Sequence, residues 1–197
     1  MKKILFAVVC LGMVACSGKT KSQVEYTEVA NSDSVEYSQN LSWNDYQFNV
    51  VVQGDSLYIE TKGKEIPTQT VQRDMMGYTV IGSEVGDLNI DGRPEVMVYL
   101  SSDGSGSYGC LMGYSITKDA QLLALELPDL SLDKKNSKGY MGHDEFAIVE
   151  NTFCRRFPVY KDGDTNANPT GGTRQIQYKL PKTDGAYTLA VDRVVEY

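Results

Sequence analysis

Hydrophobic and polar residues alternate in short runs along most of the chain, and Gly, Asn and Asp separate one run from the next. A period of two is typical of β-strands that bury one face. A hairpin signal, Gly54-Asp55, lies between the first two runs. We expect strands over residues 46–52, 56–60, 78–81, 95–100, 111–116, 121–127, 146–149, 153–160, 173–180 and 187–195.

A long hydrophobic period of 3.6 residues, the mark of an amphipathic helix, is not found in the sequence. Residues 130–141 are expected to form a short helix or a loop, and Trp43 to anchor the first strand in the core. Strands at hairpin spacing predict an all-β fold. We expect an antiparallel β-sandwich or a partly open barrel, formed as one domain by residues 41–197.

The N-terminus has the pattern of an export signal over residues 1–15: two lysines, a short apolar stretch and a final small residue. Residues 13–16 (MVAC) resemble a loose bacterial lipobox, in which Cys16 would be lipidated. An ordinary signal peptide that contains a cysteine is the alternative. The polar residues 16–40 are predicted to be a flexible tether. The protein is therefore expected in the bacterial cell envelope, on the periplasmic side or at the outer membrane, with the lipid as its membrane contact.

The charge balance limits the classes of partner. The chain has 19 Lys and Arg against 26 Asp and Glu, a net charge of −7, and removing Lys2 and Lys3 with the leader gives 17 − 26 = −9. Nucleic acid is excluded as a partner because no basic excess is available for phosphates, whereas basic proteins are favoured. The chain has one histidine, which excludes a site with several histidine ligands.

Two cysteines of the predicted domain, Cys110 and Cys154, would face an oxidising compartment after export. A disulfide between them and two separate thiols in strands are both compatible with the sequence, because geometry decides between the two. The sequence leaves this question open.

An acidic loop over residues 86–95 (GDLNIDGRPE) carries Asp87, Asn89, Asp91 and Glu95 at loop positions 1, 3, 5 and 9. Alternating oxygen ligands on a tight turn can converge on Ca²⁺. Val98 stands where an EF-hand has its bidentate glutamate, so the loop is no EF-hand; it resembles instead the calcium loops of FG-GAP-type repeats. We expect Ca²⁺, if bound, to be structural, and no other cofactor. The alternative is a turn whose side chains cap their own backbone.

A Gly- and Ser-rich loop over residues 101–109 (SSDGSGSYG) joins two apolar runs. Its small residues cannot form a core, and the loop is longer than a minimal hairpin turn. A slim tip that bears hydroxyl groups and one tyrosine could enter a narrow cleft. A surface linker without a role in binding is the alternative.

The loop and its surroundings resemble the periplasmic inhibitors of invertebrate-type lysozyme. The segments that carry the resemblance are residues 86–109 (GDLNIDGRPEVMVYLSSDGSGSYG), 139–150 (GYMGHDEFAIVE), 157–180 and 192–197 (DRVVEY). The family is all-β and inserts an S-G-x-Y loop into the lysozyme's active-site cleft. In this chain the motif is Ser105-Gly106-Ser107-Tyr108. The resemblance implies a protein inhibitor and not an enzyme, and it is compatible with a homodimer. A lipid anchor departs from the family's soluble form.

The chemistry of such a loop fits a lysozyme cleft, whose catalytic groups are carboxyls. Ser105 and Tyr108 can donate hydrogen bonds to carboxylates, and Gly106 would let the backbone pass close to a cleft wall. The competing hypothesis is a calcium-stabilised binding module of the cell envelope that recognises glycan or protein. A hydrolase built on the sequence His143-Asp144-Glu145 is disfavoured, because adjacent residues of a strand point to opposite faces.

Overall fold

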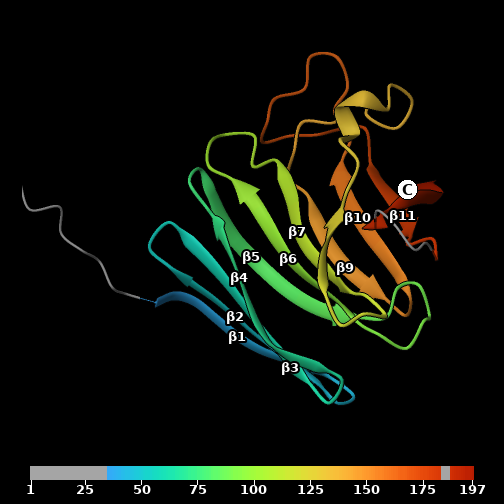
Figure 1. Ribbon diagram of the computed structural model, residues 1–197. Helices are drawn as coiled ribbons and strands as arrows, with labels where there is room; N and C mark the ends of the chain where they lie inside the picture. The colour runs from blue at the N-terminus through green and yellow to red at the C-terminus, as the bar shows by residue number, and fades with distance from the viewer. Residues whose placement is uncertain (1–34, 183–186) are drawn as a thin grey trace, which may run out of the picture. The chain divides into compact units, whose positions relative to one another are not determined.

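The computed structural model describes residues 35–182 and 187–197 (Figure 1). The predicted signal peptide, the lipidation site Cys16 and most of the predicted tether lie outside the described residues. Among the described residues, no helix has the length and apolar character needed to span a membrane.

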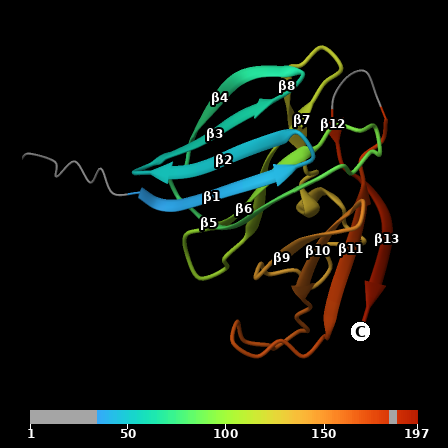
Figure 2. The ribbon, with the colours of Figure 1, turned by 90° about the horizontal axis from the view of Figure 1, so that it is seen from below.

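The described chain folds into three β-sheets, as Figure 2 shows. The N-terminal sheet is a meander of β1 (Val35–Trp43), β2 (Tyr46–Gln53), β3 (Ser56–Gly63) and β4 (Ile66–Asp74). The central sheet has the order β12 (Tyr187–Thr188), β8 (Leu122–Glu126), β7 (Gly109–Ile116), β6 (Glu95–Ser102) and β5 (Tyr78–Gly86). The C-terminal sheet has the order β13 (Ala190–Glu196), β11 (Thr173–Lys179), β10 (Thr152–Pro158) and β9 (Glu145–Val149). All pairs are antiparallel except β8 with β12.

The central sheet buries both of its faces. Along β6, Val96, Val98 and Leu100 pack in a core with residues of β2 and β3. The alternate residues Met97 and Tyr99 pack in a second core with residues of β10 and β11. A strand buried on both sides needs a continuous apolar run, which the segment VMVYL supplies. The expected all-β, sandwich-type fold is confirmed without a closed barrel, and the second core is an addition that the sequence did not indicate.

Polar contacts also join neighbouring sheets. Glu84 on β5 accepts hydrogen bonds from the backbone N–H of Ile148 on β9, at 2.7 Å, and from Tyr99 Oη at 2.5 Å. On the other side, the hydroxyl groups of Tyr37 on β1 and Ser83 on β5 lie 2.9 Å apart. Hydrogen bonds satisfy these half-buried polar groups where the sheets meet.

Most predicted strands are confirmed, but the domain begins before residue 41. Residues 35–40, which we assigned to the tether, belong to β1, where half-buried and exposed residues alternate. The alternation was hidden because the inward positions include polar residues such as Gln39. The strand β4 was not predicted either; its exposed residues are polar except for Pro67. The segment 130–141 contains one short 3₁₀ helix, η1 (Leu130–Leu132).

Cys110 and Cys154 are both free thiols, so the disulfide that the sequence left open is not formed in this structure. Cys110 packs toward the first core, on the N-terminal side of the central sheet. On β10, Phe153 faces the second core, and Cys154 therefore points to the other face of its strand, away from that core.

Candidate functional site

The predicted inhibitory loop is the turn between β6 and β7. Backbone and side-chain bonds close its base: Ser102 N–H donates to Tyr108 O at 2.9 Å, and Tyr108 N–H donates to Ser102 Oγ at 2.9 Å. Ser105 is exposed at the tip, Gly106 is half-buried, and Tyr108 is 48% exposed. The loop therefore offers its serine and tyrosine side chains to a partner.

The segment Gly142-His143 supports the loop from one side. His143 N–H lies 3.2 Å from Gly106 O and 3.1 Å from Ser107 O. Gly142 has a φ of +88°, and a Cβ placed on it would lie 1.8 Å from Gly106 O. A side chain at this position would collide with the loop backbone and strain its own backbone. Glycine is therefore required for the close approach of the two segments.

Asn166 supports the loop from a second segment, the connection between β10 and β11. Its Nδ2 donates to Ser105 O at 2.6 Å, and its Oδ1 lies 3.1 Å from His143 Nε2. Tyr160 Oη in turn donates to Asn166 O at 3.0 Å. We call Gly142, His143 and Asn166 the brace. Three segments far apart in the sequence thus meet at the Ser-Gly-Ser-Tyr loop.

The ring of Tyr108 folds back over Gly106. A Cβ on Gly106 would lie 2.4 Å from Tyr108 Cε2, so glycine at this position makes room for the tyrosine ring. The edge of Tyr108 contacts Tyr140, with ring centroids 5.6 Å apart and an interplanar angle of 69°. Edge-to-face pairs of this kind stabilise one orientation of both rings. No described side chain hydrogen-bonds to Tyr108 Oη, which is available to a partner.

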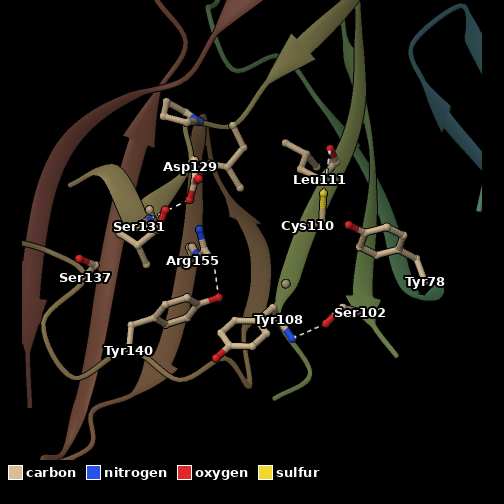
Figure 3. A pocket seen from close by; sticks show the side chains of 14 residues that line it. Tyr78, Ser102, Tyr108, Cys110, Leu111, Asp129, Ser131, Ser137, Tyr140 and Arg155 are labelled. Atoms are coloured by element: carbon tan, nitrogen blue, oxygen red, sulfur yellow. Dashed lines mark hydrogen bonds between the residues drawn. The ribbon is translucent and has the colours of Figure 1, made fainter. Parts of the chain in front are cut away.

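A buried polar network joins the end of the loop to β10, and Figure 3 shows its Arg155–Tyr140 bond. Asp144 accepts from Gly109 N–H at 2.6 Å, from Arg155 Nε at 2.6 Å and from Tyr140 Oη at 2.5 Å. Arg155 Nη2 donates to the same Tyr140 hydroxyl at 2.7 Å. Burial lowers the pKa of Arg155, but its bond to Asp144 outweighs burial and leaves the pKa raised. The network fixes the first residue of β7, where the loop ends.

The residues of the sequence His143-Asp144-Glu145 point to different surroundings, but strand alternation, the reason we expected, does not apply. Only Glu145 belongs to β9, and His143 before it has a φ of +60°. His143 lies beside Asn166, whereas Asp144 is buried against Arg155. Glu145 is exposed and lies 3.7 Å from Arg156 Nη1. The three side chains form no common site, and their role in the structure is to position the loop and β9.

The acidic loop uses its oxygens as caps for its own backbone. Asp87 accepts from the N–H groups of Asp91 and Gly92, at 3.0 and 2.9 Å. Asn89 Oδ1 also accepts from Asp91 N–H, and Asp91 pairs with Arg93 Nη2 at 2.7 Å. Within residues 35–182 and 187–197, no three His, Cys, Asp or Glu side chains are placed together as metal ligands. The arrangement is that of the capped turn, and Ca²⁺ binding stays a prediction.

Glu95 is the most deeply buried of the four acidic-loop residues. Its side chain is fully buried, accepts from Leu88 N–H at 2.7 Å and from Ser115 Oγ at 2.8 Å. Burial disfavours the charged form and raises the pKa of Glu95 to about 7, although the two hydrogen bonds lower it. Glu95 is therefore a proton-binding group of the core, joining β6 to the acidic loop and to β7.

A pocket of about 710 Å³ opens beside Tyr108, where the central and C-terminal sheets diverge (Figure 3). Tyr78 and Cys110 lie on one side, and Ser131, Ser137 and Tyr140 lie on the other. Apolar residues from β7, from the segment before η1 and from η1 itself contribute to its lining: Leu111, Leu127, Pro128 and Leu130. The pocket could not be predicted from the sequence, because its residues come from segments that are far apart along the chain.

No protein-family model, curated protein or solved structure matches this chain.

Proposed function

We propose that this protein inhibits a lysozyme of the invertebrate type by inserting the Ser-Gly-Ser-Tyr loop into the enzyme's active-site cleft, which would protect peptidoglycan. The observation that carries the proposal is the bracing of an exposed, hydroxyl-bearing loop by the backbone of His143 and the side chain of Asn166. A loop held in one conformation loses little conformational entropy when it binds.

The side chains that the loop offers suit a cleft with catalytic carboxyls. Ser105 is exposed, and Tyr108 Oη has no partner among the described side chains. Each hydroxyl can donate to a carboxylate, and a hydrogen bond to a charged group contributes about 1.5–3 kcal/mol. The net charge of −7 favours encounter with a basic enzyme. The loop blocks substrate without being cleaved, since it contains no glycosidic bond.

The direct test is an inhibition assay with the purified chain from residue 17 onward and a panel of animal and invertebrate lysozymes. We expect stoichiometric inhibition of an invertebrate-type enzyme. Absence of inhibition across the panel, with a folded protein, would contradict the proposal. We also propose that a lipid at Cys16 anchors the protein to the membrane. Mass spectrometry of the membrane fraction should detect acyl chains on Cys16, and a Cys16→Ser variant should lack them.

A further inference from the structure

The pocket beside Tyr108 has the composition of a saccharide site. Exposed tyrosine rings lie on two of its sides: Tyr78 is 40% exposed and Tyr108 is 48% exposed. Aromatic rings offer flat apolar surfaces to the C–H groups of sugar rings, and their hydroxyl groups can bond to sugar hydroxyls. The pocket volume of about 710 Å³ is within the range of small-molecule sites.

The polar groups at the rim add directed hydrogen bonding. Asp129 is exposed at the pocket, and its Oδ1 accepts from Ser131 N–H at 2.8 Å, which fixes the carboxylate in place. Ser137 contributes a hydroxyl group to the lining. A carboxylate and hydroxyl groups at fixed positions suit a ligand rich in O–H and N–H donors.

The charges and the apolar lining narrow the class of ligand. Arg155, the cation at the pocket, is already paired with Asp144 and bonded to Tyr140, so it leaves no unpaired positive charge for an anionic ligand. Leu111, Leu127 and Pro128 form an apolar part of the wall that could hold a methyl group. A neutral sugar that carries an acetamido group combines these requirements.

We infer that the pocket between Tyr78, Tyr108 and Asp129 binds a neutral N-acetylated saccharide. This inference goes beyond the proposed inhibition and is tested without any lysozyme, so the two can fail separately. The probe is the β-1,4-linked trimer of N-acetylglucosamine, titrated into the purified protein and followed by NMR of backbone amides. We expect shifts at residues 108–111 and 127–131, with a Kd on the order of 1 mM.

Matched variants decide whether the pocket is the site. Asp129→Asn keeps the acceptor for Ser131 N–H but removes the charge, and should weaken binding at least about fivefold. Asp133→Asn is the same change in the same turn, at a residue that caps Lys135 and Asn136 and does not line this pocket, and should bind like the wild type. No shifts at a ligand concentration of about 10 mM, or equal weakening in both variants, would overturn the inference. Equal binding of the glucose trimer would overturn the assignment of the acetamido group.

Discussion

Asn166 and Ser105 are 61 positions apart in the sequence, yet Asn166 Nδ2 donates a 2.6 Å hydrogen bond to Ser105 O at the tip of the β6–β7 loop. The Asn166 amide also contacts His143, whose backbone N–H bonds to the carbonyl groups of Gly106 and Ser107 in the loop. The loop that would enter an enzyme is therefore held by residues that need not touch the enzyme. The loop residues that would contact the enzyme and the brace residues that hold the loop can therefore be tested by separate substitutions.

Asn166→Ala should weaken inhibition while leaving the fold intact. The change removes the bond to Ser105 O, worth about 1 kcal/mol, and we expect a loss of inhibition of about fivefold. Asn168→Ala is the control in the same connection, because Asn168 Nδ2 bonds only within the connection, to Thr165 Oγ1 at 3.4 Å. The measurement is the inhibition constant together with the thermal midpoint. An unchanged constant for Asn166→Ala would show that the brace does not set the loop's inhibitory conformation.

Ser105→Ala and Tyr108→Ala should each weaken inhibition at least about tenfold, since each removes a donor that the proposal assigns to a carboxylate. Both side chains are exposed, so the melting temperature should change little. Tyr58→Ala, a half-buried tyrosine on the N-terminal sheet, controls for removing a ring elsewhere. Wild-type potency in either loop variant would remove that residue from the mechanism.

Gly142→Ala should displace the loop, because its Cβ would lie 1.8 Å from Gly106 O and its φ is +88°. Backbone strain of this kind costs about 1–3 kcal/mol, and the collision adds to it. Gly163→Ala separates the two effects: its φ is +90°, but nothing lies within 4 Å of the added Cβ. We expect a fall in unfolding free energy for both variants and a loss of inhibition for Gly142→Ala alone. Inhibition and urea denaturation measure the two outcomes, and a Gly142→Ala variant that inhibits normally would contradict the proposed contact.

Glu95 should make the protein less stable as the pH rises. Its pKa is about 7 in the folded protein and about 4.3 in an unfolded chain. Between these values the folded state binds the extra proton, so the free energy of unfolding decreases with rising pH, by about 2–3 kcal/mol from pH 4.5 to 8. Glu95→Gln keeps an acceptor for Leu88 N–H and a donor for Ser115 Oγ, and should abolish this part of the pH dependence. Urea denaturation at both pH values tests it; a variant with the wild-type pH dependence would contradict it.

Thermal denaturation tests whether the acidic-loop residues bind Ca²⁺. If Asp87, Asn89, Asp91 and Glu95 bind Ca²⁺, millimolar CaCl₂ should raise the thermal midpoint, and Asp87→Asn should reduce the effect. Asp87 and Asp91 already accept backbone N–H groups, so the absence of a calcium-dependent change would leave backbone capping as the role of the loop. If CaCl₂ raises the thermal midpoint and Asp87→Asn removes this increase, the acidic loop binds Ca²⁺. That result would favour the competing hypothesis of a calcium-stabilised binding module.

Local chemistry fixed the strands and turns that the sequence analysis could predict. The Gly54-Asp55 turn, for example, joins β2 to β3 as predicted, with Gln53 opposite Ser56. Alternation and turn residues act over a few positions, and they are visible in the sequence. The strand β1 was not predicted, because its inward positions include polar residues, which weaken the pattern.

The sequence alone thus determined the all-β class, most strands and the hydroxyl-bearing loop. The tertiary structure decided that β6 is buried on both faces, that the two cysteines stay free thiols, and that Gly142 and Asn166 hold the loop. The pocket beside Tyr108 likewise exists only in the folded chain. These features depend on which distant segments become neighbours when sheets pack, and the local hydrophobic pattern does not encode that pairing.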